Sequence, residues 1–325
     1  MIKVDKDFLQ KFELELDTTH PDKGDSPVKM LGFGEISIVI EILHEDWKGL
    51  ALKRVPIFDT VEQVERHIKA YNEYNNLLRE KVGLNIPDFG TEWVYTDLRK
   101  KEKNPIALYC IQKKFDPKSV AHHLIHQLSE SEIEVLVQLL MRELHKVWKF
   151  NYSQTQYEIG IDGQISNWIL EDYEASVRVY DTSKFWYCDT STPLYRVDGN
   201  EAMEAVLFLK SAPKSLRWVL KALFLEDTVN RYYDMRLVTT DLIANFYKEQ
   251  RPELIPRLIQ IVNDFFEKEA SEFGLTPLNL KEIKKYYRSD ANMWRVFQAF
   301  RKMDRATKKI FGKRYDFYLP SKIKR

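Results

Sequence analysis

The chain has 325 residues, of which 44% are hydrophobic and 13% aromatic, so it can build two sizeable lobes and is not a disordered chain. Its 50 basic and 49 acidic residues leave a net charge of +1, which excludes a global electrostatic field directed at nucleic acid or an anionic membrane. No signal-peptide pattern or long apolar span is visible, and the two cysteines lie in apolar runs. We therefore expect a cytoplasmic protein with buried thiols that has neither nucleic acid nor a membrane as a partner.

The first third of the chain alternates strand-like and helix-like segments. Two β-branched runs at 35–44 and 50–58, joined by a charged turn, predict an antiparallel hairpin. Apolar residues spaced by three and four positions predict a helix over 60–81. Two further strands are expected at 92–95 and 106–113.

The second part of the chain is helical, with one strand-rich insert. Ser129 and Glu132 form a candidate capping box that begins a helix reaching about residue 150. After the insert, the chain from residue 201 onward is expected to be helical, with a locally basic stretch over 301–325 that suits a solvated tail or helix face better than a nucleic-acid patch. This order predicts an α+β bilobal protein, with an N-terminal lobe over 1–115 and a mainly helical lobe over 116–325.

The insert contains the tripeptide Asp-Thr-Ser twice, beginning at Asp181 and at Asp189. The apolar runs 177–180 and 185–188 precede the two copies, and each predicts a short strand that ends at an aspartate. Each aspartate is either an ordinary turn former or a functional carboxylate.

Three candidates for phosphate chemistry lie in the first lobe. The segment LGFGEIS places Gly32 and Gly34 where backbone N–H groups can approach phosphate oxygens, although a plain glycine turn is the alternative. Lys53 lies within an otherwise apolar strand and either faces solvent or points inward. Glu73 on the following helix is either a surface residue or the partner that neutralises Lys53.

A fourth candidate is the segment GIDGQISNW, in which Asp162 and Asn167 stand five residues apart. A carboxylate that accepts a hydroxyl proton and an amide oxygen that binds Mg²⁺ both suit such a loop. The spacing alone is common by chance.

The order of these motifs resembles the protein-kinase-like superfamily, whose glycine loop, strand lysine, helix glutamate, catalytic loop and metal-binding aspartate follow one another in this way. The resemblance covers about residues 31–193. The segment LLMRELHKVW looks more like the aminoglycoside and choline phosphotransferase branch than the protein kinases, since no activation loop or A-P-E segment follows. The motifs GEIS, DGQISNW and DTSTP also resemble an uncharacterised prokaryotic group.

The resemblance implies an enzyme that binds ATP and Mg²⁺. It makes Asp162 the catalytic base and Asn167 a metal ligand, and it makes the segment 108–115 the hinge whose backbone meets adenine. The residues that it assigns to nucleotide binding are Gly32, Gly34, Lys53, Glu73, Ile111 and Gln112.

The second metal ligand is either Asp181 or Asp189. The spacing from Asn167 favours Asp181, which lies fourteen residues further on. Asp181 also stands in a good polar turn, whereas Asp189 leads toward Pro193 and into the helical lobe. We therefore predict Asp189, with Asp181 as its rival.

Two residues depart from the pattern of the superfamily. Gly160 stands where a histidine or tyrosine usually supports the catalytic loop. This difference bears on the shape of the loop more than on its chemistry. Ile36 and Ser37 stand near the place of a third glycine, so the glycine loop is shortened.

A polar helix face is expected in the second lobe, where Asp227, Arg231 and Asp234 follow one another at steps of four and three residues. Asp241, Asn245 and Lys248 continue the spacing. The face is either a structural one with internal ion pairs or a wall that binds a hydroxylated or charged acceptor.

The resemblance thus implies phosphoryl transfer from Mg²⁺–ATP to the hydroxyl of an unidentified small molecule. The alternatives are a pseudokinase that binds nucleotide to control a protein partner, nucleotidyl transfer on the same fold, and a purely structural role.

Overall fold

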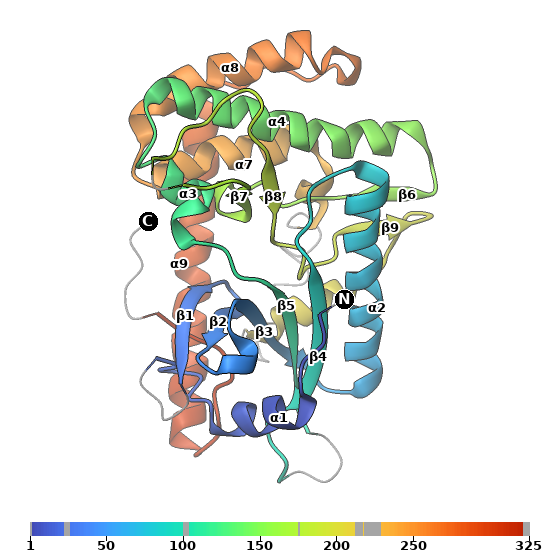
Figure 1. The fold of residues 1–325 in the computed structure, drawn as a ribbon, viewed down its shortest axis with the longest axis vertical. Coiled ribbons are helices and arrows are strands. Elements are labelled where there is room, and N and C mark those ends of the chain that lie inside the picture. Colours follow the sequence, from blue (N-terminus) through green and yellow to red (C-terminus); the bar gives the residue numbers. More distant parts are fainter. Residues whose placement is uncertain are drawn as a thin grey trace.

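The computed structural model describes residues 2–22, 27–99, 104–174, 176–211, 217 and 229–320. Their N-terminal part is a five-stranded antiparallel sheet in the order β1-β2-β3-β5-β4, which occupies the lower half of Figure 1. The strands are β1 (Val28–Phe33), β2 (Ile38–Ile42), β3 (Leu50–Phe58), β4 (Phe89–Tyr95) and β5 (Ile106–Lys113). Helix α1 (Lys6–Glu15) and helix α2 (Val61–Asn76) pack on the sheet, and a π-helical turn over Leu77–Val82 extends α2.

The sheet separates two hydrophobic cores. On the central strand β5, Ala107, Tyr109 and Ile111 belong to the core beneath α1, whereas Leu108 and Cys110 belong to the core shared by α2 and the helical lobe. This alternation follows from the two-residue period of a strand. It explains why the whole run is apolar, since both faces of β5 are covered.

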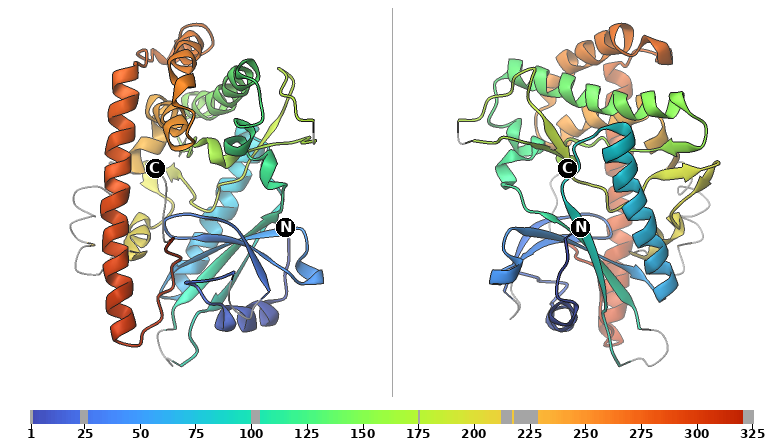
Figure 2. Two further views of the ribbon diagram at one scale, coloured as in Figure 1. Left: turned by 90° about the vertical axis from the view of Figure 1, so that its left-hand side faces the viewer. Right: turned by 45° about the vertical axis from the view of Figure 1, so that its right-hand side comes forward.

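The C-terminal part is mainly helical, and its layers are stacked in the upper half of Figure 1. Its helices are α3 (Ala121–Leu124), α4 (Glu130–Ser153), α7 (Met235–Lys248), α8 (Ile255–Lys268) and α9 (Leu280–Ile310). The predicted capping box is confirmed at the start of α4, where Ser129 and Glu132 bond reciprocally to each other's backbone. Helix α9 runs along one edge of the molecule past both parts, as the left view of Figure 2 shows.

Two small sheets lie between the long helices. One is the hairpin of β7 (Trp168–Leu170) and β8 (Phe185–Tyr187), and the other joins β6 (Tyr157–Ile159), β9 (Tyr195–Val197) and β10 (Asn200–Glu201). Antiparallel sheet first and helices later is the α+β arrangement that the sequence predicts, and it is confirmed. No helix among the described residues is long and apolar enough to cross a membrane.

Some predicted elements are wrong or incomplete. Residues 177–180 form no strand, so the only strand of the doubled Asp-Thr-Ser region among the described residues is β8. The strand Val28–Phe33 was not expected, and the expected run 35–44 begins as a turn and becomes a strand only at Ile38. These segments are short, and their pairing depends on partners that are distant in sequence.

The N-terminal segment lies against the sheet at Gly90. The backbone N–H of Ile2 donates to the carbonyl oxygen of Phe89 at 2.9 Å. A Cβ atom on Gly90 would lie 2.0 Å from the carbonyl oxygen of Ile2, so only glycine permits this approach.

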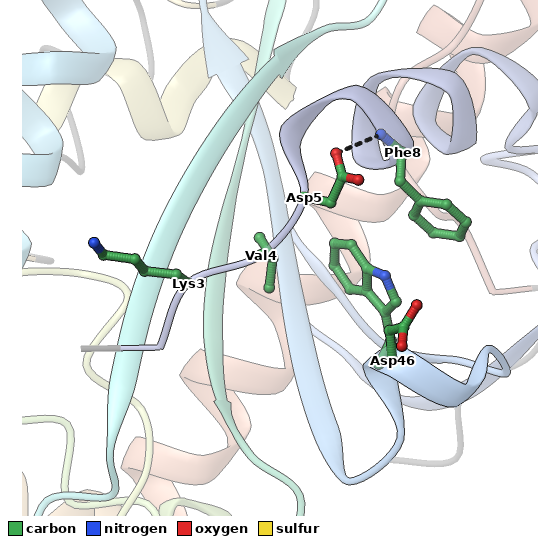
Figure 3. Close-up of a pocket in the computed structure, with 6 residues that line it drawn as sticks. Lys3, Val4, Asp5, Phe8 and Asp46 are labelled. Atoms are coloured by element: carbon green, nitrogen blue, oxygen red, sulfur yellow. Dashed lines mark hydrogen bonds between the residues drawn. The ribbon is translucent and has the colours of Figure 1, made fainter.

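A cavity of about 320 Å³ opens between the start of α1 and the turn at Glu45–Trp47. Asp5, Phe8 and Asp46 gather on one side of it, and Lys3 extends away from them (Figure 3). Because Trp47 belongs to the core beneath α1, the cavity lies on the α1 side of the sheet.

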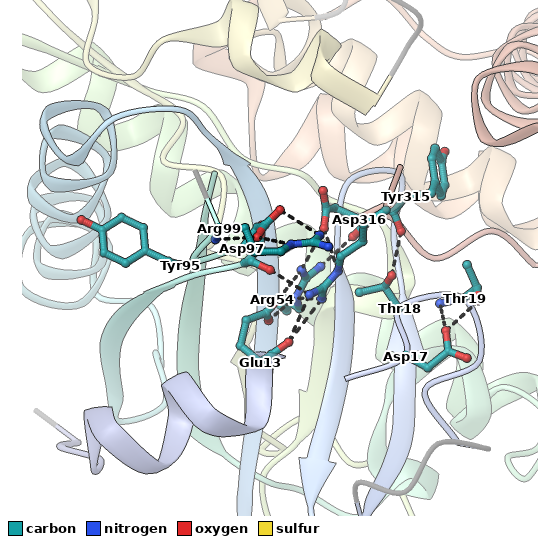
Figure 4. A network of polar contacts seen from close by, with 12 residues as sticks. Glu13, Asp17, Thr18, Thr19, Arg54, Tyr95, Asp97, Arg99, Tyr315 and Asp316 are labelled. Atoms are coloured by element: carbon teal, nitrogen blue, oxygen red, sulfur yellow. Dashed lines mark hydrogen bonds and ion pairs between the residues drawn. The ribbon is translucent and has the colours of Figure 1, made fainter. Parts of the chain in front are cut away.

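A buried ion network ties α1 to the sheet and to the chain after α9 (Figure 4). The guanidinium of Arg54 on β3 donates to both carboxylate oxygens of Glu13 at 2.7 Å, and Glu13 also accepts from Tyr109 and Arg314. Arg54 donates further to the carbonyl oxygen of Asp316 at 2.6 Å. Burial raises the pKa of Glu13, but Arg54 and Arg314 prevail and hold it below its ordinary value.

We expect Arg54→Ala to lower the free energy of unfolding by about 3–5 kcal/mol, because it leaves the Glu13 carboxylate buried without its main partner. The matched control is Arg142→Ala, which breaks the half-exposed pair with Glu269 and should cost less than about 1 kcal/mol. Urea unfolding of both variants measures the difference. Equal losses would show that the network contributes no more than a surface pair.

Candidate functional site

The site is centred on Lys53 of β3. Because side chains alternate along a strand, Lys53 points to the face opposite Arg54, toward the helical lobe. Its Nζ atom lies 2.6 Å from Oδ1 of Asp189, which follows β8. Burial lowers the pKa of Lys53, but the charge of Asp189 outweighs it, so the pKa lies above its ordinary value. This ion pair joins the sheet to the second lobe.

Asp189 lies beside Asn167 because the β7–β8 hairpin brings the ends of its two strands together. The backbone N–H of Cys188 donates to the carbonyl oxygen of Asn167 at 2.9 Å. Ser191 Oγ also donates to Asp189 Oδ1, at 3.2 Å. Lys53 and Ser191 therefore both bind Oδ1 of the Asp189 carboxylate. Within the described part of the chain, Oδ2 has no hydrogen-bond or ion-pair partner.

Asp162 completes the cluster. Asn167 Nδ2 donates to the backbone carbonyl oxygen of Asp162 at 3.0 Å, and the backbone N–H of Gln164 donates to Asp162 Oδ1 at 3.1 Å. Burial, Asp241 and Asp189 together raise the pKa of Asp162 to about 7. A carboxyl group with that pKa can accept and release a proton near neutral pH.

Other residues support the loop at Gly160, where the superfamily usually has a larger side chain. The hydroxyl of Tyr74 on α2 donates to the Gly160 carbonyl oxygen at 2.8 Å, and the Gly160 N–H donates to the Leu194 carbonyl oxygen at 2.9 Å. A Cβ atom at this position would lie 3.0 Å from the Tyr232 carbonyl oxygen and 3.1 Å from the Tyr233 ring. The loop is thus held by its neighbours, and there is little room for a side chain.

Asn167 and Asp189 offer oxygen atoms of the kind that could hold a magnesium ion. The side-chain nitrogen of Asn167 is hydrogen-bonded to the Asp162 carbonyl oxygen, so its Oδ1 atom remains available to a metal ion. Asp189 offers Oδ2, because its Oδ1 atom contacts Lys53. No group of three or more His, Cys, Asp or Glu residues that could hold a metal occurs among the described residues. Two protein oxygens are nevertheless a usual provision for Mg²⁺, which takes its other ligands from water and phosphates.

Asp181 lies apart from this cluster. It is exposed in a turn in which the Ser183 backbone N–H donates to the Tyr180 carbonyl oxygen at 2.9 Å. Nothing in the described residues brings it to Lys53.

The sheet register places the glycine segment in line with Lys53. Gly32 pairs with Val39, and Val39 pairs with Lys53, so the three residues form one row across β1, β2 and β3. Gly34 lies in the turn between β1 and β2, where its N–H donates to the Ser37 carbonyl oxygen at 2.9 Å. A Cβ atom on Gly32 would meet nothing within 4 Å, so the space beside this residue is open.

The structure does not bring Glu73 to Lys53. Glu73 accepts from the hydroxyl of Tyr195 at 3.0 Å, and its other neighbours line the outer side of α2. Successive residues of an α-helix are about 100° apart, so Glu73 lies about 200° from Tyr71. Tyr71 is buried on the inner face, where burial raises its pKa well above 10 and Cys110 and Asp189 add to the effect. The expected pairing of Lys53 with Glu73 is therefore wrong.

The predicted hinge position also needs correction. Ile111 and Gln112 lie within β5 and pair with both β3 and β4, so their backbone groups belong to the sheet. The strand ends at Lys113, and the N–H of Lys114 donates to the Gly49 carbonyl oxygen at 2.7 Å. The chain leaves the sheet after this point.

The predicted polar helix face is interrupted. Asp227 lies outside the described residues, Arg231 lies in a 3₁₀ turn over Arg231–Tyr233, and Asp234 caps the start of α7 by accepting from the Leu237 N–H at 2.8 Å. Arg231 and Asp234 therefore do not lie within one continuous α-helix.

The later residues of the predicted face do lie together on α7. Asp241 and Asn245 are buried there, and Asn245 Nδ2 donates to the Asp241 carbonyl oxygen at 2.9 Å. Asp241 acts on the pKa of Asp162, and Gly163 packs tightly on α7, because a Cβ atom there would lie 2.5 Å from Val238 Cγ1. This end of α7 therefore borders the loop of Asp162.

A family model described as "Family of unknown function (DUF6206)" matches residues 15–305. The chain belongs to this family. The match covers the sheet, the Lys53–Asp189 pair and most of α9, so the matched residues contain the whole candidate site.

Comparison with solved structures gives low similarity scores. The structure titled "WaaP in complex with acyl carrier protein" has 12% identity and a TM-score of 0.28, and the match covers 63% of this chain and 89% of that one. A GDP and kanamycin complex of APH(2")-IIia has 13% identity and a TM-score of 0.34, with 78% and 97% coverage. No curated protein sequence matches the chain. The description of the fold rests on the strands and helices above.

Aromatic and histidine contacts that the sequence did not predict hold this site of the DUF6206 chain together. His67 on α2 contacts the Ser191 carbonyl oxygen through Nε2 at 3.0 Å, and Tyr74 supports Gly160. Val64, His67, Tyr71 and Tyr74 follow one another at three- and four-residue steps and are all buried. This spacing in the sequence could have identified the inner face of α2, and it shows that Glu73 does not belong to that face.

We expect acid to destabilise the protein through His67. Burial lowers the pKa of His67 from 6.5 to about 4, so the unfolded chain takes up a proton below pH 6.5 while the folded chain does not. By linkage, up to about 3 kcal/mol of stability is lost as the pH falls from 6.5 to 4. His67→Gln keeps a donor for Ser191 but does not titrate, so the stability advantage of the wild type over this variant should shrink across that range. Urea unfolding at pH 7, 5.5 and 4 measures it, and a constant difference would contradict the assignment.

Proposed function

We propose that the chain is a Mg²⁺- and ATP-dependent phosphotransferase that acts on the hydroxyl group of a small molecule. The observation that supports this best is the 2.6 Å ion pair between Lys53 Nζ and Asp189 Oδ1, with Asn167 and Asp162 beside it. Catalysis of phosphoryl transfer consists mostly of positioning and of charge stabilisation around the phosphoryl group. A lysine, a free carboxylate oxygen and a proton acceptor held in one cluster suit that task.

The nucleotide is proposed to lie along the row formed by Gly32, Val39 and Lys53. Lys53 would donate to phosphate oxygens, and Gly32 and Gly34 would let backbone N–H groups approach them. Adenine would meet the backbone after β5, over residues 114–116.

Asn167 Oδ1 and Asp189 Oδ2 would hold the magnesium ion. When bound, the ion supplies positive charge that offsets the charge on the phosphates. Lys53 would fix the orientation of the Asp189 carboxylate through Oδ1.

Asp162 is proposed to accept the proton of the acceptor hydroxyl. The hydroxyl oxygen forms a bond to the γ-phosphorus, the bond from that phosphorus to the β,γ-bridging oxygen breaks, and ADP leaves. A pKa of about 7 lets Asp162 take this proton near neutral pH and release it afterwards. Arg231, Asp241 and Asn245 form the polar surroundings on the acceptor side.

Arg231 is proposed to contact the acceptor. Its guanidinium donates to the hydroxyls of Tyr286 and Tyr232 at 3.2 Å each, and its Nε atom is buried with no hydrogen-bond partner among the described residues. A guanidinium has five N–H donors, so donors remain available.

A second candidate function is a pseudokinase, in which bound nucleotide controls a protein partner. One observation favours it: the inner face of α2 offers Lys53 no acidic partner, because the buried residue Tyr71 stands there. Nucleotidyl transfer on the same residues is a further alternative, and it differs in the product, because it releases pyrophosphate and moves AMP.

Nucleotide binding is tested by comparing the two aspartates of the doubled tripeptide. ATP with Mg²⁺ should raise the melting temperature of the wild type, and Asp189→Asn should remove most of this shift because it removes the charge beside Lys53 and Asn167. Asp181→Asn is the matched control and should keep the full shift. No shift of the wild type with any nucleotide, or equal effects of both variants, would overturn the site.

Turnover is tested with Asp162→Asn and with Glu73→Gln as the control. An amide cannot accept the proton, so Asp162→Asn should lower kcat by about 10²- to 10⁴-fold while the Mg²⁺–ATP thermal shift remains. Glu73→Gln should change neither by more than about twofold, since Glu73 lies outside the cluster. ADP, AMP and pyrophosphate are measured across a library of hydroxylated metabolites. AMP transfer would support the nucleotidyl alternative, and a Mg²⁺-dependent shift without any turnover would support the pseudokinase.

A further inference from the structure

Arg231 is a mostly buried cation that has no carboxylate partner among the described residues. Its Nη1 and Nη2 atoms donate to the hydroxyls of Tyr286 and Tyr232, which are neutral groups, at 3.2 Å each. Its Nε atom is buried and has no hydrogen-bond partner within the same residues. Because removing a charge from water is costly, a buried arginine is usually paired with an anion. Arg231 therefore lacks the partner that its position calls for.

The segment around Arg231 is held in place by its neighbours. Arg196 donates to Oδ1 of Asn230, and its guanidinium lies 3.9 Å from the centre of the Tyr233 ring. The hydroxyl of Tyr233 donates to Oε2 of Glu201 at 2.9 Å. These contacts fix the chain on both sides of Arg231 without using its guanidinium. The N–H groups that remain are therefore available to a ligand.

This segment packs directly on the loop that carries Asp162. The backbone N–H of Ile161 donates to the carbonyl oxygen of Tyr232 at 2.9 Å, so the residue before Asp162 is bonded to the residue after Arg231. Burial raises the pKa of Asp162 most strongly, and the charge of Arg231 acts against it. Arg231 thus lies within electrostatic reach of the proposed base.

The nearest internal anion does not take the place of a ligand. Asp241 on α7 is close enough for Arg231 to act on its carboxylate, but the two form no ion pair. Burial raises the pKa of Asp241, and the opposing charge of Arg231 does not reverse the shift. Asp241 is buried, whereas Arg231 keeps part of its surface, so a molecule that arrives from solvent meets the guanidinium first.

We propose that Arg231 binds an anionic oxygen group of the acceptor, either a carboxylate or a phosphate. The inference rests on the phosphotransferase proposed above, and it narrows the acceptor to a hydroxylated anion. The planar guanidinium offers paired N–H donors that match the oxygen atoms of both groups. Since Arg231 and Asp162 lie on adjoining segments, one small molecule can place its anionic group on the first and its hydroxyl on the second.

The anion site is tested with acetate and inorganic phosphate as probes. The full chain is melted with Mg²⁺ and the β,γ-imido analogue of ATP, and chloride keeps the ionic strength constant. At least one probe should raise the melting temperature more than chloride does, and the better probe identifies the group as carboxylate or phosphate. Arg231→Met should weaken this probe by at least about tenfold. Arg231→Lys should have an intermediate effect, because it keeps the charge but loses the paired donors.

The acceptor itself is tested by turnover. Hydroxylated metabolites are sorted by charge, and ADP formation should occur with those that carry a carboxylate or a phosphate. For the best of these, Arg231→Met should raise KM by at least about tenfold and change kcat by less than about threefold, because Arg231 holds a part of the acceptor that does not react.

Arg257→Met is the matched control. Arg257 lies on α8 and pairs with Glu134 at 3.0 Å, and its side chain is 59% exposed. This variant also removes a guanidinium, but it should change neither probe binding nor KM by more than about twofold. Circular dichroism and urea unfolding establish that all three variants fold.

Four results would overturn the proposal. Acetate and phosphate might stabilise the protein no more than chloride, Arg231→Met could leave their affinity unchanged, or Arg257→Met could cause an equal loss. The fourth is turnover of neutral or cationic hydroxyl compounds in preference to anionic ones, in which case the phosphotransferase stands and only the anionic acceptor fails. Stabilisation by anions without nucleotide binding, or without any turnover, would instead contradict the phosphotransferase and with it the role of the bound anion as an acceptor.

Discussion

The alternation of two neighbouring side chains on β3 is the constraint on which the rest of the structure depends. Lys53 and Arg54 are both cations that the sheet holds away from bulk water, and they point to opposite faces. Each is neutralised by a carboxylate from a distant part of the chain, Asp189 on one side and Glu13 on the other. A shift of β3 by one residue would exchange the two faces and leave both charges without partners. The register of one strand therefore fixes both the site and the closure of the sheet.

The fold and the order of the motifs were largely predictable from the sequence, because they depend on local patterns. The capping box at Ser129, the apolar strand at β5 and the amphipathic spacing of α2 are each read within a few neighbouring residues. The strand Val28–Phe33 was missed because it is short and is interrupted by Lys29 and Gly32, and it is held by pairing with β2. The α1 network could not be predicted, since its members come from residues 13, 54, 109, 314 and 316.

Within the candidate site, some of the predicted residues lie together and others do not, and the difference has a physical reason. Lys53, Asp162, Asn167 and Asp189 lie in one cluster because each follows or occupies a strand whose pairing brings it there. Glu73 was misplaced because a helix turns by 100° per residue, so an error of two positions reverses the side on which a side chain lies. The two copies of Asp-Thr-Ser also differ in their surroundings. The second copy follows the paired strand β8, whereas the segment 177–180 before the first copy forms no strand.

The turn at Gly312, which has a φ of 61°, ends α9 and sends the chain back to the sheet, where Arg314 and Asp316 complete the ion network. A ribosome delivers these residues roughly three hundred positions after Glu13. During synthesis the Glu13–Arg54 pair of the first lobe is therefore complete long before Arg314 and Asp316 emerge to join it. The lobe that comes first in the sequence thus gains its full set of contacts only after the final helix and turn have been synthesised.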